Sequence, residues 1–336
     1  MPDRPVLPRV VVTRRLPGAT ERRLSELFDT VLRDSDEPMS ADAMKRAIAD
    51  CDVFVPTVTD TITADIIRAA SPRLKLIANF GAGTDHIDVA EAHARGITVT
   101  NTPGVLTEDT ADLAMALILA VPRRLVEGDR RMRAGQFSGW GPTHMLGHRV
   151  RGKRLGILGM GRIGSAVARR AHAFGLDVHY HNRHPAPAGI ERALEASYHA
   201  TLEDMLPQID ILSISAPLTP DTHHLIDART LALMRPDSYL VNVSRGGVVD
   251  EGALAAALEA GRLAGAGLDV YEDGPRPHPR LLQLDTVILA PHIASATHES
   301  RREMGDKVLI NIRAMIDHHA CPDRVLPPGA RVALAS

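Results

Sequence analysis

At 336 residues the chain is long for one domain and comfortable for two. Aromatic residues make up only 3% of it, so we expect mostly aliphatic cores. The formal net charge of −2 gives no reason to expect nucleic acid or an anionic membrane as a partner. Arginine pairs such as Arg123 and Arg124 are therefore interpreted as solvated helix faces.

Cysteine and histidine usage argues against disulfides and metals. The two cysteines, Cys51 and Cys321, cannot build a disulfide framework, which fits a reducing compartment. The sixteen histidines form no ligand cluster at metal spacing, so no metal site is predicted. The first residues lack the apolar core of a signal peptide, and the apolar run 114–121 is too short to span a bilayer. We expect a soluble, cytoplasmic protein.

Strands and helices alternate along the first part of the chain. Strands are expected at 8–13, 52–56, 74–79 and 97–100, with helices at 21–28 and 63–70. This alternation predicts a parallel sheet with crossover helices. The stretch 101–104 (Asn-Thr-Pro-Gly) breaks the pattern. A long helix is expected at 106–124, followed by an arm or loop of turn composition at 135–150.

The stretch 155–164 joins a short apolar run to the pattern Gly159-x-Gly161-x-x-Gly164, with an alanine-rich helical pattern behind it. A strand, a tight glycine turn and a helix N-terminus in this order form a dinucleotide site. The glycines allow the turn, the approach of the pyrophosphate and close packing of helix on strand. Glycines also occur in plain turns, but here both flanks match what the motif requires. The stretch therefore predicts nucleotide binding.

A second alternation follows the glycine loop. Its strands are expected at 177–181, 209–215, 238–242, 265–269 and 286–290. The final helix, 295–318, has nothing after it that could pair, and we expect it to return to the first domain. We therefore predict an α/β protein of two doubly wound parallel-sheet domains. A Rossmann-type dinucleotide-binding domain, 104–293, is inserted into a flavodoxin-like substrate domain formed by 1–103 and 294–336.

The residues after the strand 177–181 indicate which dinucleotide binds. Asn182 stands where an acidic residue would bind the ribose 2′-hydroxyl of NAD, and Arg183 follows it. An acid would repel a 2′-phosphate, whereas asparagine with arginine would accept it. We predict NADP(H) in preference to NAD(H), which remains possible. The alternative is that Arg183 is merely solvated.

Two further strand ends carry candidate catalytic side chains. Arg245 follows the strand 238–242, and a guanidinium there can clamp a carboxylate with two parallel hydrogen bonds. His292 follows the strand 286–290, where an imidazole can act as a general acid near neutral pH. Taken singly, each could be structural, Arg245 in a salt bridge and His292 as a satisfied core histidine. Their occurrence together with the glycine loop favours catalysis.

The chain resembles the D-isomer-specific 2-hydroxyacid dehydrogenases, especially their glyoxylate/hydroxypyruvate reductase (glycerate dehydrogenase) branch, over nearly its whole length. The motifs that carry the resemblance stand in the family's order: 80–88 (FGAGTDHID), 101–104 (NTPG), 110–114 (TADLA), the glycine loop, 242–247 (NVSRGG), 267–272 (GLDVYE) and Pro291-His292. The resemblance implies an enzyme that reduces a short 2-oxo acid, glyoxylate or hydroxypyruvate, to the D-2-hydroxy acid with NAD(P)H.

The resemblance also implies roles for single residues. Arg245 would hold the substrate carboxylate and polarise the 2-oxo group, His292 would protonate the carbonyl oxygen, and the backbone at Ala82 and Gly83 would bind the carboxylate. Asp269 would contact the nicotinamide carboxamide. The cofactor-binding residues it implies are Gly159, Met160, Gly161, Arg162, Ile163, Gly164, Asn182, Arg183, His184, Ser215, Ala216, Pro217, Val243, Ser244, Arg245, Asp269, His292 and Ala294.

The helix after Thr107 and the arm at 135–150 resemble the family's dimer-forming elements, so a homodimer is implied. Trp140 in the arm would reach the neighbouring subunit, unless it is simply an exposed or core tryptophan.

One position departs from the family. The family usually has a glutamate that partners the catalytic histidine where this chain has Gly274. Without that carboxylate, His292 is expected to be less well oriented and less readily protonated. Three interpretations follow: Glu272 or Asp273 replaces the lost group, the enzyme works at a reduced rate, or the protein is an NADP(H)-binding regulatory module with little activity.

Overall fold

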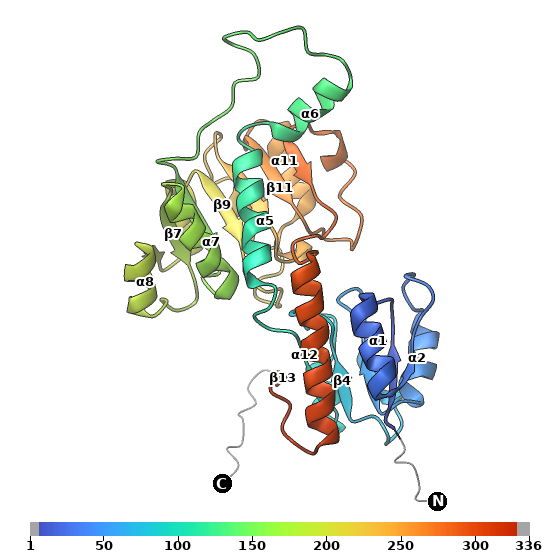
Figure 1. Ribbon diagram of the computed structural model, residues 1–336. Helices are drawn as coiled ribbons and strands as arrows, with labels where there is room; N and C mark the ends of the chain where they lie inside the picture. Colours follow the sequence, from blue (N-terminus) through green and yellow to red (C-terminus); the bar gives the residue numbers. More distant parts are fainter. Residues whose placement is uncertain (1–6, 328–336) are drawn as a thin grey trace, which may run out of the picture. The chain divides into compact units, whose positions relative to one another are not determined.

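Short runs of buried aliphatic residues form the sheet of the first structural unit. The computed structural model describes residues 7–327 and places the residues up to Leu106 and those from Thr297 onward in this unit, and Thr107–Ala296 in a second (Figure 1). The sheet of the first unit has the strand order β13-β5-β4-β3-β1-β2. These strands are β1 (Arg9–Val12), β2 (Asp29–Val31), β3 (Val53–Val55), β4 (Leu76–Ala78), β5 (Thr98–Thr100) and β13 (Arg324–Val325).

Strands β1 to β5 are parallel in the order 2-1-3-4-5, which is the flavodoxin-like arrangement. The helices of this unit are α1 (Gly18–Leu27), α2 (Ala41–Ala49), α3 (Ala64–Arg68), α4 (Val89–Ala94) and α12 (His298–Ile316). The last helix lies against α1 and β4, where Met304, Val308 and Ile312 are buried in the core (Figure 1). The final helix therefore packs on the sheet of the first unit and is part of that unit.

The second unit has a parallel sheet of seven strands in the order β12-β11-β10-β9-β6-β7-β8, the Rossmann order extended by one strand. The strands are β6 (Arg154–Leu158), β7 (Asp177–His181), β8 (Ser197–His199), β9 (Ile211–Ile214), β10 (Tyr239–Asn242), β11 (Gly265–Leu268) and β12 (Val287–Leu289). Its helices are α5 (Thr107–Ala120), α6 (Leu125–Arg133), α7 (Arg162–Ala173), α8 (Ala188–Leu194), α9 (Leu202–Met205), α10 (Ala228–Leu231) and α11 (Glu251–Glu259). The predicted fold class is confirmed.

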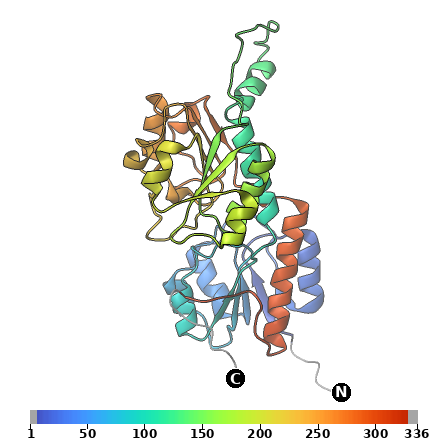
Figure 2. The ribbon, with the colours of Figure 1, turned by 90° about the vertical axis from the view of Figure 1, so that its left-hand side faces the viewer.

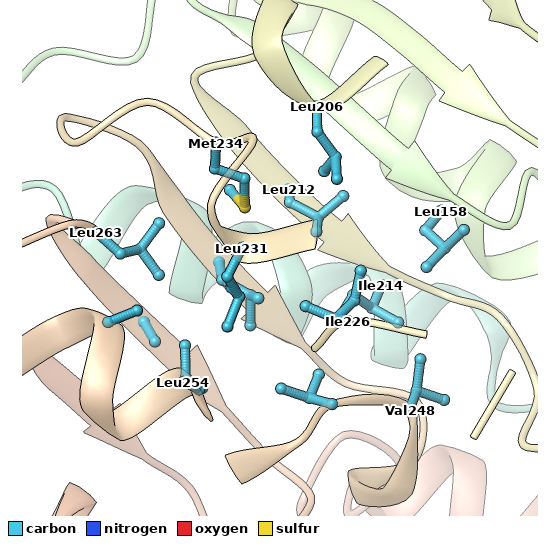
Figure 3. Packing of buried hydrophobic residues seen from close by; sticks show 14 of the residues in the cluster. Leu158, Leu206, Leu212, Ile214, Ile226, Leu231, Met234, Val248, Leu254 and Leu263 are labelled. Atoms are coloured by element: carbon cyan, nitrogen blue, oxygen red, sulfur yellow. The ribbon is translucent and has the colours of Figure 1, made fainter. Parts of the chain in front are cut away.

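The core on one face of this sheet is aliphatic, as the composition predicts. Leu212 and Ile214 of β9 pack with Leu231 of α10, with Leu254 of α11, and with Val248 in the turn before α11 (Figure 3). The buried members of this cluster are all Leu, Ile, Val, Ala or Met. Burying each large aliphatic side chain stabilises the fold by about 1.5–3 kcal/mol relative to leaving it exposed.

The structure corrects several sequence-based elements. Strands β2 and β8 and helix α2 were not expected. The expectation that nothing after the final helix could pair is wrong, because β13 pairs antiparallel with β5 in the register Arg324 to Thr100. The helix expected at 106–124 stops at Ala120, because Pro122 has no N–H to continue it, and Arg124 then adopts a left-handed φ of 55° before α6 begins.

The arm expected at 135–150 contains no helix or strand, and with α6 it extends away from the sheet of its unit (Figures 1 and 2). Among residues 7–327, no helix has both the length and the apolar composition that a membrane crossing requires.

Candidate active site

The predicted cofactor residues of the second unit lie at one edge of its sheet. Each group directly follows a strand: Gly159 follows β6, Asn182 follows β7, Ser215 follows β9, and Val243 follows β10. Asp269 follows β11, and His292 comes shortly after β12. Because all seven strands are parallel, their carboxyl ends meet at this edge, where doubly wound sheets bind their ligands.

The glycine loop fits a dinucleotide. Gly159 has a φ of 99°, and a Cβ there would lie 2.8 Å from the backbone nitrogen of Ala216. A Cβ on Gly164 would lie 2.1 Å from the carbonyl oxygen of Gly159, so α7 can pack this close only with glycine. Gly161, the N-cap of α7, has open space at its Cβ position and no side-chain cap. The helix N-terminus is therefore open to an anionic pyrophosphate.

Asn182 is bound to this loop rather than pointing freely into solvent. Its Oδ1 accepts a hydrogen bond of 2.7 Å from the backbone N–H of Met160. Arg183 and His184 are exposed. Within residues 7–327, the Arg183 guanidinium makes no hydrogen bond or ion pair. Its position next to Asn182 leaves it available for an anion outside the protein.

The segment after β9 also carries an unused polar atom. Ser215 donates its backbone N–H to the carbonyl oxygen of Leu158, at 2.8 Å, which joins this segment to the strand before the glycine loop. Its Oγ is buried and, in the described part of the chain, has no hydrogen-bond partner. Ala216 is buried and Pro217 is exposed. A buried hydroxyl without a partner at this edge fits a bound ligand.

Arg245 stands in a turn that Asn242 shapes. Asn242 is buried, and its Oδ1 accepts hydrogen bonds from the N–H (3.0 Å) and the Oγ (2.8 Å) of Ser244. Its Nδ2 donates to the carbonyl oxygen of Arg245, at 2.9 Å. The next residue must be small, because a Cβ on Gly246 would lie 1.9 Å from the carbonyl carbon of Tyr271. The half-buried guanidinium of Arg245 therefore projects from a fixed backbone.

Asp269 holds the turn that carries His292. Its two carboxylate oxygens accept hydrogen bonds of 2.8 Å from the backbone N–H groups of Ile293 and Ala294. Burial raises the pKa of Asp269, while these hydrogen bonds and the positive charge of His292 oppose the shift. His292 is exposed and has a left-handed φ of 55°, a conformation that non-glycine residues adopt only when surrounding contacts hold it. The contact of Asp269 with a nicotinamide carboxamide stays a prediction.

The loop that contains Gly274 places the neighbouring acidic residues in contacts of their own. Gly274 has a φ of 63° and open space at its Cβ position. The nearby Glu272 is hydrogen-bonded to Nε2 of His224, and Asp273 pairs through its backbone with Arg276. Glu272 can therefore replace the missing glutamate only by leaving His224. With His223, this pair forms a group of three possible metal ligands, which corrects the expectation of no such cluster.

In the first unit, Ala82 and Gly83 follow β4 in a loop held by two asparagines. Asn79 donates its Nδ2 to the carbonyl oxygen of Gly83 (2.9 Å), and Asn101 donates to that of Ala82 (2.6 Å). Within the described residues, the N–H groups of Ala82 and Gly83 donate no hydrogen bond. The two asparagines hold the loop through its carbonyl oxygens. Its unused N–H groups can then donate to an anion such as a carboxylate.

Asn242 and Glu251 support the backbone of the candidate site, and neither was assigned such a role from the sequence. Glu251 is buried and accepts hydrogen bonds from the N–H groups of Glu272 (2.6 Å) and His278 (2.7 Å). The sequence signal that could have identified Asn242 is an amide residue at the end of an apolar strand. Glu251 gives no such signal, because an acidic residue in a first helical turn is expected there in any case.

Comparisons with known proteins identify the family to which the chain is related. Residues 115–294 match the model of the D-isomer specific 2-hydroxyacid dehydrogenase NAD binding domain. A glyoxylate reductase of Korarchaeum cryptofilum is 45% identical over 331 residues, 96% of this chain and 99% of that protein. One of Thermococcus litoralis is 42% identical over 322 residues, 95% of this chain and 96% of that protein.

A solved structure extends the agreement to three dimensions. An NADPH-dependent glyoxylate/hydroxypyruvate reductase of Sinorhizobium meliloti, in complex with NADP and malonate, superposes with a TM-score of 0.85. It is 37% identical, and the match covers 95% of this chain and 96% of that one. The chain therefore belongs to the D-isomer-specific 2-hydroxyacid dehydrogenase family, in its glyoxylate reductase branch, and its second unit is a nicotinamide-cofactor-binding domain.

Proposed function

We propose that this protein reduces a short 2-oxo acid, glyoxylate or hydroxypyruvate, to the D-2-hydroxy acid, with NADPH preferred over NADH. The observation that carries the proposal is the placement of Arg245 and His292 on two fixed turns at the same sheet edge as the glycine loop. Relatives named glyoxylate reductase support the choice of substrate.

When bound at the glycine loop, NAD(P)H would be the source of the hydride for the 2-oxo carbon. Arg245 binds the substrate carboxylate with parallel hydrogen bonds and polarises the 2-oxo group. In the first unit, the N–H groups of Ala82 and Gly83 donate no hydrogen bond within the described residues, and we propose them as further donors for a carboxylate. His292, as imidazolium, gives its proton to the carbonyl oxygen and becomes neutral. Asp269 holds the backbone of that turn in place.

The preference for NADPH rests on Asn182 and Arg183. The neutral Asn182 does not repel a 2′-phosphate, and the exposed Arg183 guanidinium can pair with it. The Sinorhizobium meliloti structure contains NADP, which agrees with this assignment.

The test is steady-state oxidation of NADPH and NADH with a panel of small 2-oxo acids. Replacing a general acid costs roughly 10²–10⁴ in rate, so His292→Asn should lower kcat by that factor. Arg245→Lys keeps the charge but removes the fork geometry, and should raise KM for the acid. Tight NADPH binding with no turnover of any acid would refute the proposal.

That failure would favour the alternative of an NADP(H)-binding regulatory module. The observation behind this alternative is Gly274, together with the engagement of Glu272 by His224. In this case Gly274→Glu should restore turnover to an inert wild type, since only the lost carboxylate would separate the chain from activity.

We also propose a cytoplasmic homodimer assembled through the arm after α6. Trp140 is 85% exposed, Leu146 67% and Phe137 48%, and apolar groups this open in one arm suit a partner subunit. Light scattering after size exclusion should give a dimer for the wild type and a monomer for Phe137→Ser with Trp140→Ser. An unchanged dimer would exclude this arm as the contact.

A further inference from the structure

Three side chains from two segments of the second unit that are far apart in the sequence form a cluster, and the mechanism proposed above assigns no role to its two histidines. Each of His223, His224 and Glu272 offers one ligand atom, and these atoms lie within 4.8 Å of one another. Nε2 of His224 is hydrogen-bonded to Oε1 of Glu272. The rings of His223 and His224 stack with their centroids 4.0 Å apart. The contact between His224 and Glu272 alone does not explain why a second imidazole, that of His223, lies beside them.

The backbone on both sides of the cluster is fixed. His224 donates its N–H to the carbonyl oxygen of Gly247, at 2.9 Å. Glu272 donates its N–H to the buried carboxylate of Glu251, at 2.6 Å. His224 also has a left-handed φ of 50°, which is uncommon for a residue with a side chain and persists only where contacts hold it. The three side chains therefore project from anchored positions.

We propose that His223, His224 and Glu272 bind a divalent transition-metal ion, with Zn²⁺ the preferred one. Two imidazoles and one carboxylate are a donor set that suits Zn²⁺, with water in the remaining position. His223 and Glu272 are exposed, so an ion can reach the cluster from solvent. The bound ion would join the segment at 223–224 to the loop that contains Gly274. While Glu272 holds the ion it is not available to His292, so the test reads metal binding itself rather than reductase activity.

The test is calorimetric titration of tag-free, EDTA-treated protein with ZnCl₂ in the absence of substrate and cofactor. We expect one ion per chain. Loss of even an indirect partner of a metal site weakens binding by about 10–100-fold, so His223→Gln and Glu272→Gln should each weaken Zn²⁺ binding by at least about tenfold. The matched control is His318→Gln with His319→Gln, because that second adjacent pair is outside the cluster and should bind Zn²⁺ like the wild type.

Two readouts keep the result interpretable. Circular dichroism and thermal unfolding in EDTA show whether each variant is folded. The thermal midpoint of the wild type should rise on adding Zn²⁺, and that of Glu272→Gln should rise less. Absence of Zn²⁺ binding, or equal binding by wild type and folded cluster variants, would overturn the proposal. Neither result depends on whether the protein reduces 2-oxo acids.

Discussion

The side-chain oxygen of Asn182 accepts a hydrogen bond from the backbone N–H of Met160, at 2.7 Å. The residue expected to select the cofactor is thus tied to the loop expected to bind the pyrophosphate. Asn182→Asp keeps an acceptor for Met160 and adds a negative charge. The new carboxylate would repel the 2′-phosphate of NADPH and accept a hydrogen bond from the ribose 2′-hydroxyl of NADH. Because a hydrogen bond to a charged group contributes about 1.5–3 kcal/mol, we expect kcat/KM for NADPH to fall by at least about tenfold relative to NADH.

The control for this change is Asn182→Ala, which removes the acceptor without adding charge. It should impair both cofactors through the glycine loop. Equal cofactor preference in Asn182→Asp and the wild type would show that this position does not select the 2′ substituent.

Arg183 can be separated from Asn182 by a charge series. We expect Arg183→Ala to raise KM for NADPH by about tenfold and to leave NADH nearly unchanged, because only NADPH carries the 2′-phosphate. Arg183→Lys should retain part of the NADPH affinity, since lysine keeps the charge but loses the bidentate fork. Equal losses for both cofactors would assign Arg183 a structural role instead.

The pH dependence of reduction tests the role of Gly274. A general acid works only while protonated, so kcat/KM should fall as pH rises through the pKa of His292. A neighbouring carboxylate favours the imidazolium, so Gly274→Glu should move this fall to higher pH. Gly274→Gln carries the same strain at a φ of 63° but no charge, and should leave the position of the fall unchanged. The same profile for both variants would contradict the role of the charge.

A stability prediction concerns Gly305 in α12. A Cβ there would lie 2.1 Å from Oγ1 of Thr20, a buried residue of α1 with a short side chain that cannot swing away. We expect Gly305→Ala to lower the free energy of unfolding by about 1–3 kcal/mol, because overpacking outweighs the gain in helix propensity. Gly128→Ala in α6, whose nearest atom is 3.9 Å away, should be neutral or stabilising. Urea unfolding measures both, and a stabilised Gly305→Ala would contradict this packing.

Central strands such as β3 (Val-Phe-Val) and β4 (Leu-Ile-Ala) could be predicted from the sequence because each is a continuous apolar run. The edge strands could not. β2 reads Asp-Thr-Val and β8 reads Ser-Tyr-His; neither contains a fully buried residue, and each pairs on one side only. Two-residue β13 exists only because β5 offers it a free edge. Local composition contains no information on such partners.

The candidate site likewise has parts that could be predicted from the sequence and parts that could not. Arg245, His292 and the glycine loop could be predicted because each directly follows or closely follows a strand with a recognisable residue pattern. The hydrogen bond between His224 and Glu272 and the anchoring of two N–H groups by Glu251 could not, because they depend on how loops fold back. These contacts join residues far apart in the chain, and no spacing rule connects them.

The pairing of β13 with β5 has a consequence for synthesis on the ribosome. The continuous second unit, Thr107–Ala296, has been synthesised in full before α12 and β13 are made. The first unit, by contrast, must wait with Leu76–Ala78 and Thr98–Thr100 uncovered until the last residues arrive. The part of the protein that is translated first is thus completed last, and its incomplete apolar sheet is prone to aggregation during that interval.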